Sequence, residues 1–488
     1  MPSGNPLFAT KSVDQLRSDA EGSHGLKRTL TATDLVLLGI GAIIGTGIFV
    51  ITGHSAAKYA GPAVVLSFVV AGIASAFAGL CYAEMASMIP IAGSAYTYSY
   101  ATMGELIAWA IGWDLILEYA MGAATVSVGW SGYVVAFVRD FIHINLPAAW
   151  TTAPFIYEEA TGFVRTGAFL NVPAMFITLL ATVILVIGIK ESARFNAVIV
   201  FVKLAVVVVF IAVGARFVHP ENWHPFIPPN EGPGRFGFSG IMRGAASVFF
   251  AYIGFDAVST AAQETKNPQK DLPTGILGSL AICTVLYIGA SLVLTGLVPY
   301  SQLSVPHPVA FGAKATGIGW LEAAVEIGAV AGLSSVMIVM LMGQPRVFFS
   351  MAMDGLFPKF ATKVHPRYGT PYITTIITGV ACAIAGGLLP IGVLGDLVSI
   401  GTLFAFVLVS LGVMILRIKR PDIPRAFRFP GGTYLVPVCG AASALYIIMS
   451  SGIATQLRLV IWMAIGLVIY AAYGRRHSKL RAASRAQR

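Results

Sequence analysis

Charged residues are scarce in this chain. Asp, Glu, Lys and Arg together account for 11% of its 488 residues, whereas a soluble globular protein carries roughly 25%. Hydrophobic residues reach 56%, and the mean hydropathy is +0.79. Such a chain lacks the polar surface that a water-facing exterior needs, so the composition excludes an ordinary soluble domain and predicts a polytopic membrane protein.

Cysteine is also scarce: four residues lie inside apolar runs and form no Cys-x-x-Cys pair. This excludes a disulfide scaffold, and we expect the four to be small core residues. The sequence also lacks a nucleophile–base arrangement, a phosphate-binding loop and a cluster of metal ligands. We therefore expect no enzyme activity, no cofactor and no metal.

Alternating patterns of about ten residues, which would indicate a β-barrel, are missing as well. Instead the chain contains continuous apolar runs close to the roughly 20 residues that a helix needs to cross a bilayer. The pattern predicts an all-α fold with 12 transmembrane helices. The runs are 33–54, 62–89, 98–123, 171–190, 195–217, 239–262, 273–298, 321–344, 371–389, 393–416, 433–451 and 455–473.

The positions of Lys and Arg predict the orientation. If the N-terminus is cytoplasmic, 23 of the 32 basic residues fall in cytoplasmic segments, eight fall outside and one, Lys203, falls within a span. Cytoplasmic loops of membrane proteins carry such an excess. We expect a multi-pass protein of the cell (inner or plasma) membrane with cytoplasmic tails at 1–32 and 474–488. The net charge of +10 then reflects topology rather than a nucleic-acid partner.

Two of the twelve runs carry glycine near mid-membrane. The first has glycines at 39, 41, 45 and 47, and the sixth has Gly254 shortly before Asp256. Glycine weakens a helix, and interrupted helices at matching places of two halves indicate a transporter's central site. Free N–H groups at such a break suit a carboxylate and free carbonyls suit an ammonium group, so we expect a zwitterionic ligand. Close helix packing through glycine is the alternative interpretation.

Charges deep in the apolar runs cost roughly 2.5–3.5 kcal/mol each and need a partner or a function. Lys203 lies in the run 195–217, where no residue can pair with it, so it must point at another helix. Burial favours the neutral amine of a lysine, which makes Lys203 a candidate for proton release; a fixed interhelical hydrogen bond is the alternative. Glu118 and Asp114 share a helix face. We expect Glu118 to be the deeper, cavity-facing residue, and a protonated structural carboxyl is the alternative.

The run 321–344 carries two further pairs of polar residues. Glu322 and Glu326 lie at its outer end, where we expect them near interfacial water. Ser334 and Ser335 are candidates to face the central cavity. A serine in a membrane helix more often bonds its own backbone four residues earlier, which is the alternative for this pair.

Several motifs spread from about residue 33 to 430 carry a family resemblance. They are LGIGAIIGTGIF (38–49), AGPA (60–63), YAEM (82–85), PIAGSAYTY (90–98), GFD (254–256), ETKNPQ (264–269), GQPR (343–346) and MDGL (353–356). Together they resemble the amino acid permeases of the amino acid–polyamine–organocation superfamily, specifically the bacterial form of its cationic amino acid transporter branch. The resemblance implies a LeuT-type fold of five-plus-five inverted repeats with two additional helices. On this chain the repeats would be 33–217 and 239–416, and the additional helices 433–473.

The resemblance also implies the roles of particular residues. The backbone that would bind the substrate carboxylate belongs to Gly45, Thr46 and Gly47. The carbonyls that would hold the α-amino group lie around Ala42, Ile43, Phe250, Ala251 and Ile253, and Phe250 would be the aromatic gate. The proton-coupling residues would be Lys203, Ser334 and Ser335. Glu118 would be an acidic cavity residue, and Met337 would face the substrate side chain.

We therefore expect a secondary active transporter that imports L-amino acids by proton symport through alternating access. Since Met337 is bulky, small neutral amino acids or a broad range are favoured, and cationic substrates stay open. An exchanger without proton coupling and an amino-acid-binding nutrient sensor are the alternatives. The expected partners are an L-amino acid, protons and the lipid bilayer; the sequence does not determine whether a single-span accessory subunit associates with it.

Overall fold

The computed structural model describes residues 10–11, 29–89, 94–158, 161–188, 193–429 and 432–486. Most of the predicted N-terminal tail therefore lies outside the described residues. The same holds for the start of the motif at 90–98, for the end of the predicted span 171–190 and for the last two residues of the C-terminal tail.

The described chain is mainly helical. Its longer helices are α2 (Ala32–Ile43), α4 (Val64–Met88), α5 (Ser94–Thr102), α6 (Glu105–Phe141), α7 (Val172–Ile187), α8 (Ala193–Gly214), α9 (Gly237–Val248), α11 (Pro268–Leu297), α13 (Gly319–Met353), α14 (Tyr372–Leu388), α15 (Ile391–Lys419), α16 (Leu435–Ser450) and α17 (Ile453–Ile469). Shorter helical pieces include η2 (Gly47–Ile51), α3 (Thr52–Ser55), η8 (Phe249–Tyr252), α10 (Ala257–Thr260), α12 (Pro308–Ala315) and α19 (Lys479–Ala486). Strands β1 (Phe155–Glu158) and β2 (Gly162–Arg165) form an antiparallel hairpin.

Among the described residues, eight helical segments are long and apolar enough to cross a membrane, and four shorter apolar helices accompany them. Each predicted apolar run overlaps one of these segments. Large apolar side chains on them point outward: Phe201, Val285 and Ile453 are each at least 70% exposed. Such surfaces suit lipid rather than water. The polytopic, helical membrane protein predicted from composition is confirmed.

The third predicted span is wrong in its bounds. The sequence predicts 98–123, whereas α5 ends at Thr102, and α6 begins after Gly104, whose φ of 95° breaks the helix, and continues to Phe141. The apolar pattern fades after residue 123 because buried polar residues such as Ser127 and Ser131 interrupt it. In the same way α13 passes through Pro345 to Met353, beyond the predicted end at 344.

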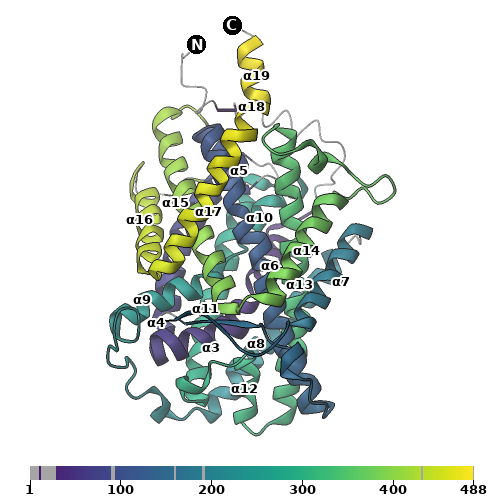
Figure 1. Ribbon diagram of the computed structural model, residues 1–488. Coiled ribbons are helices and arrows are strands. Elements are labelled where there is room, and N and C mark those ends of the chain that lie inside the picture. The colour runs from purple at the N-terminus through teal and green to yellow at the C-terminus, as the bar shows by residue number, and fades with distance from the viewer. Residues whose placement is uncertain are drawn as a thin grey trace.

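The two tails meet at one end of the bundle. Lys11 forms an ion pair with Asp354, at the end of α13, and the Tyr96 hydroxyl donates to the other oxygen of that carboxylate at 2.7 Å. Arg481 of α19 pairs at 2.8 Å with the fully buried Glu105 at the start of α6. We call this the terminal end, and the opposite end, where α12 and the β-hairpin lie, the far end (Figure 1). An even number of crossings returns a chain to its starting side, so this arrangement fits any even number of spans, and the count of twelve stays a prediction.

Candidate functional site

The first interrupted helix breaks where its glycines predict a break. Helix α2 ends at Ile43, and Ile44 turns into an extended conformation with ψ of 101°. Gly45 and Thr46 follow before η2 begins at Gly47. All of these residues are buried, so the break lies inside the protein. The helix ends of such a break leave backbone groups without helical partners.

The second interrupted helix breaks at the matching glycine. Helix α9 tightens into the 3₁₀ turn η8, and Ile253 is extended, with φ of −65° and ψ of 137°. Gly254 then has φ of +117°, a conformation that favours glycine. A Cβ atom at Gly254 would lie 2.8 Å from the carbonyl carbon of Ala42. Glycine is therefore required for both backbone shape and close approach.

The two breaks touch one another. Gly254 lies against the backbone of Ala42, and Gly47 lies against Ala251. The Tyr287 hydroxyl of α11 lies 2.9 Å from the carbonyl oxygen of Ile43 and 2.8 Å from that of Ala251. A hydroxyl has one proton, so it satisfies one of these two carbonyls at a time. Sequence reasoning missed Tyr287, whose only signal was a tyrosine inside an apolar run.

Lys203 points at another helix, as its position in the sequence predicts. Its ammonium nitrogen donates to the carbonyl oxygens of Gly41, at 2.5 Å, and of Ile44, at 3.1 Å. The side chain is fully buried, and its stem lies beside Gly332 of α13. Lys203 therefore satisfies carbonyls at the broken end of α2 and places a titratable amine in the interior.

The break also contains an unsatisfied hydroxyl. Thr46 is fully buried, and its Oγ1 has no hydrogen-bond partner. Buried polar groups are normally paired, so each exception needs an explanation. An oxygen of this kind beside two groups of freed backbone atoms is where a bound polar ligand would make a contact.

Acidic side chains lie beside the second break. Glu118 neighbours Asp256, which accepts a hydrogen bond from the Tyr119 hydroxyl at 3.2 Å. One oxygen of Glu118 and both oxygens of Asp114 lack hydrogen-bond partners. Asp114 and Glu118 are 1% and 2% exposed, so burial does not separate them, and the role of Glu118 as the cavity-facing residue stays a prediction. Asp256 joins Glu118 as an acidic residue of this region.

The remaining predicted site residues lie near the breaks in different ways. Phe250 is buried within η8. The Ser334 hydroxyl donates to Val330 four residues earlier, at 2.8 Å, and accepts from the Trp130 indole at 2.9 Å. This is the local backbone bond that we named as the alternative. Ser335 is buried, and its hydrogen-bonding role stays a prediction.

Val336 of α13 lies beside the first break. Its Cγ2 lies 3.2 Å from where a Cβ of Gly45 would be. Met337, which we expected to face the substrate, is fully buried with its sulfur 3.9 Å from the Thr178 hydroxyl of α7. Val336, a residue that sequence reasoning missed, therefore limits the space beside Gly45.

One expectation at the far end is wrong. Glu326 was expected near interfacial water, yet it is 0% exposed, because α12 and the end of α6 cover the start of α13. Glu322 is partly exposed.

Comparison with known proteins finds a matching family model and several similar transporters. The family model described as amino acid permease matches residues 30–471. The chain is 50% identical over 476 residues to the branched-chain amino acid permease BcaP of Bacillus subtilis, covering 97% of this chain and 99% of that protein. It is 47% identical over 474 residues to the methylthioribose transporter of the same organism, with the same coverage. It is 37% identical over 419 residues to the vacuolar cationic amino acid transporter 4 of Arabidopsis thaliana, covering 86% of this chain and 68% of that one.

Proposed function

The chain belongs to the amino acid permease family, and on that premise we propose that it imports aliphatic L-amino acids together with protons. Membership makes it a membrane transporter of amino acids rather than an enzyme. The observation that carries the finer proposal is the contact between two broken helices, with an unsatisfied Thr46 hydroxyl at one of them. The proposed mechanism is alternating access, in which the site opens to one side of the membrane at a time.

We propose a LeuT-type arrangement for the helices. Residues 33–217 and 239–416 would form two inverted five-helix repeats, and 433–473 would add two helices. The breaks support this, because each falls in the first helix of its block. The excess of basic residues supports cytoplasmic termini, which would make the terminal end of the bundle the cytoplasmic end.

The two breaks would bind the two charges of an amino acid. The N–H groups at Gly45, Thr46 and Gly47 begin the second half of the first broken helix, where a carboxylate is stabilised by the helix dipole. The Thr46 hydroxyl would donate to the same carboxylate. The carbonyls around Ala42, Ile43, Phe250, Ala251 and Ile253 would accept from the ammonium group. Because Tyr287 satisfies only one of the Ile43 and Ala251 carbonyls at a time, an acceptor stays available.

The apolar side chains at the breaks support an aliphatic substrate. Val336 lies beside Gly45, and Phe250 is buried within η8. A branched-chain amino acid permease is 50% identical to this chain. The methylthioribose transporter is nearly as similar, but a thiosugar carries neither of the charges that the two breaks suit. We therefore favour small to medium aliphatic amino acids over cationic ones and over methylthioribose.

Proton coupling would act through Lys203. While charged, its ammonium group holds the carbonyls of Gly41 and Ile44. Loss of its proton would weaken both hydrogen bonds, since a charged donor bonds roughly twice as strongly as a neutral one. The end of α2 would then be free to move, which links the proton to the opening of the site. Ser334 and Ser335 would adjust this region from α13.

Uptake by the purified protein in proteoliposomes tests the proposal. We expect radiolabelled L-valine to accumulate under an inward proton gradient, with competition from L-leucine and L-isoleucine but not from L-arginine or methylthioribose. Thr46→Ala should weaken valine binding, whereas Thr295→Ala, which removes another fully buried threonine hydroxyl, should not. If methylthioribose competed with valine while L-leucine and L-isoleucine did not, the proposed aliphatic amino acid substrate would be refuted. Valine counterflow without any response to the gradient would favour an exchanger, and binding without either form of transport would favour a sensor.

A further inference from the structure

Three carboxylates meet at the far end of the bundle, away from the breaks. Asp140 lies in the last turn of α6, while Glu322 and Glu326 lie in the first turns of α13. One oxygen of each lies within 4.8 Å of the others. Glu326 is fully buried, and neither of its oxygens has a hydrogen-bond partner. A buried carboxylate without partners is costly, so the cluster lacks a component that would satisfy it.

The cations already present do not supply that component. Lys314 of α12 lies 3.1 Å from Asp140 and 3.2 Å from Glu322. Arg139 pairs with Asp140 at 2.8 Å. Among the described residues, these two cationic groups pair with Asp140 and Glu322, and neither forms an ion pair with Glu326. If a divalent cation replaced Lys314, its charge and that of Arg139 would balance the three carboxylates.

We propose that Asp140, Glu322 and Glu326 form a binding site for a calcium ion, with Lys314 as its built-in competitor. The three oxygens lie within 4.8 Å of one another, close enough to bind one ion. Calcium takes about six to eight oxygen ligands in flexible geometry, whereas magnesium is usually bound by one or two carboxylates and keeps several waters. Three carboxylates in one cluster therefore favour calcium over magnesium.

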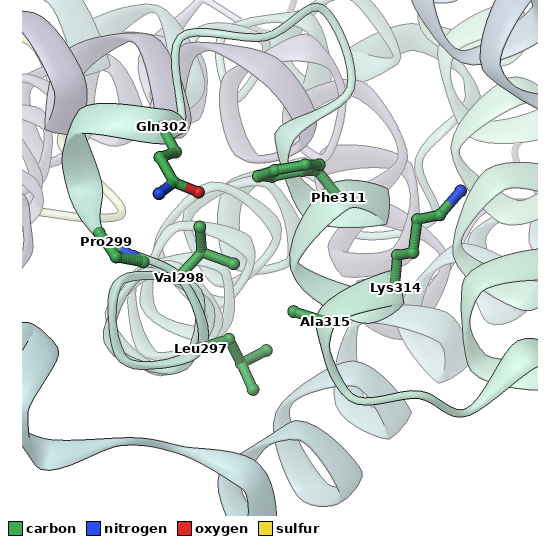
Figure 2. Close-up of a pocket in the computed structure, with 7 residues that line it drawn as sticks. All are labelled: Leu297, Val298, Pro299, Gln302, Phe311, Lys314 and Ala315. Atoms are coloured by element: carbon green, nitrogen blue, oxygen red, sulfur yellow. The ribbon is translucent and has the colours of Figure 1, made fainter.

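Lys314 has room to leave the cluster. Its side chain is 50% exposed, and its stem lines an open cavity of about 270 Å³. In Figure 2 its nitrogen points away from the other lining side chains. The other residues around the cavity are Leu297, Val298, Pro299, Gln302, Phe311 and Ala315. A bound ion would join α6 directly to α13. It would also break the ion pairs by which Lys314 links α12 to these two helices.

Calcium titration of the purified, full-length protein in detergent tests the site. After treatment with a chelator, CaCl₂ or MgCl₂ is added while thermal unfolding is followed. We expect calcium to raise the melting temperature in a saturable way, because a ligand that binds only the folded state stabilises it. Magnesium should have a smaller effect. Glu326→Gln should abolish the calcium response, and the exposed control Glu231→Gln, which removes one partner of the Arg235 ion pair, should keep it.

Lys314→Gln provides an independent test, because it retains all three carboxylates. In this variant the site should be half-saturated at a calcium concentration about three- to tenfold lower than in the natural protein, because the ion pairs of Lys314 with Asp140 and Glu322 no longer compete with calcium. This variant also serves if Glu326→Gln fails to fold. The proposal would be overturned if calcium shifted the melting temperature of neither the natural protein nor Lys314→Gln. An undiminished response in folded Glu326→Gln would overturn it as well.

Discussion

Replacing Lys203 with Met tests the proposed proton coupling most directly. Met retains most of the stem that packs beside Gly332 but lacks the nitrogen that donates both hydrogen bonds. The carbonyls of Gly41 and Ile44 then lose the ammonium group that lies 2.5 and 3.1 Å from them. A buried acceptor without its partner costs about 1–3 kcal/mol, and relief from burying a cation offsets part of this. We expect a folded variant with a lowered melting temperature.

The effect on transport is larger and specific. With one proton per substrate, a gradient of about one pH unit supports roughly tenfold accumulation, since a tenfold ratio corresponds to about 1.4 kcal/mol. We expect the natural protein to approach this ratio in proteoliposomes and Lys203→Met to reach only equal concentrations inside and outside. Valine counterflow, which needs no net proton movement, should persist in the variant.

Two further variants make the result interpretable. Lys203→Arg keeps the charge and the donors but cannot release a proton, so it should also lose the response to the gradient. Lys270→Met removes an exposed lysine and should behave like the natural protein. If Lys203→Met accumulates valine to the same ratio as the natural protein, the reasoning about Lys203 is refuted.

Three other variants test the geometry around the site and at the far end. Gly254→Ala forces an alanine to adopt φ of +117° with its Cβ against Ala42. The backbone alone should cost about 1–3 kcal/mol. The melting temperature of this variant should therefore fall well below that of Gly317→Ala, where φ is +72° and a Cβ would meet no atom within 4 Å. Tyr287→Phe removes the hydroxyl shared by Ile43 and Ala251 and should change valine affinity by up to about tenfold, from a net hydrogen bond of about 0.5–1.5 kcal/mol; an unchanged dissociation constant would contradict this. Burial lowers the pKa of His307 to about 4, so the unfolded chain binds a proton there before the folded protein does, and stability should fall as pH drops from about 6.5 to 4; His307→Gln should flatten this decline in pH-dependent thermal unfolding.

The sequence predicts the interrupted helices because their cause is local. Glycines at 39, 41, 45, 47 and 254 weaken the helix wherever it packs, and the breaks occur at Ile44–Gly45 and Ile253–Gly254. The partner of Lys203 is predictable only as another helix, since apolar runs show which segments are buried but not which neighbours they have. The same limit hides Tyr287 and Val336, whose roles arise from contacts between distant runs.

The extent of α6 and the burial of Glu326 escape prediction for a related reason. Hydropathy identifies segments that face lipid, whereas the second half of α6 is enclosed by protein and tolerates serine and threonine. Glu326 follows the start of α13 by two turns, which suggests an interfacial position, but α12 packs on this part of α13 and Glu326 is buried. Both features depend on tertiary packing, which overrides local composition.

The contacts at the end of α2 suggest how proton and substrate binding are coupled over a short distance. Lys203 holds the carbonyl of Ile44, and Tyr287 meets the adjacent carbonyl of Ile43. On the proposed function, a substrate ammonium group would compete with Tyr287 for that carbonyl, while proton release from Lys203 would loosen its neighbour. Substrate binding and proton release thus act on adjacent carbonyls of the same turn. Each therefore changes the free energy of the other directly, without a chain of intervening residues. A double variant, Lys203→Met with Tyr287→Phe, should therefore change valine affinity by less or more than the sum of the single effects. Strict additivity of the two free-energy changes would show that the two side chains act independently.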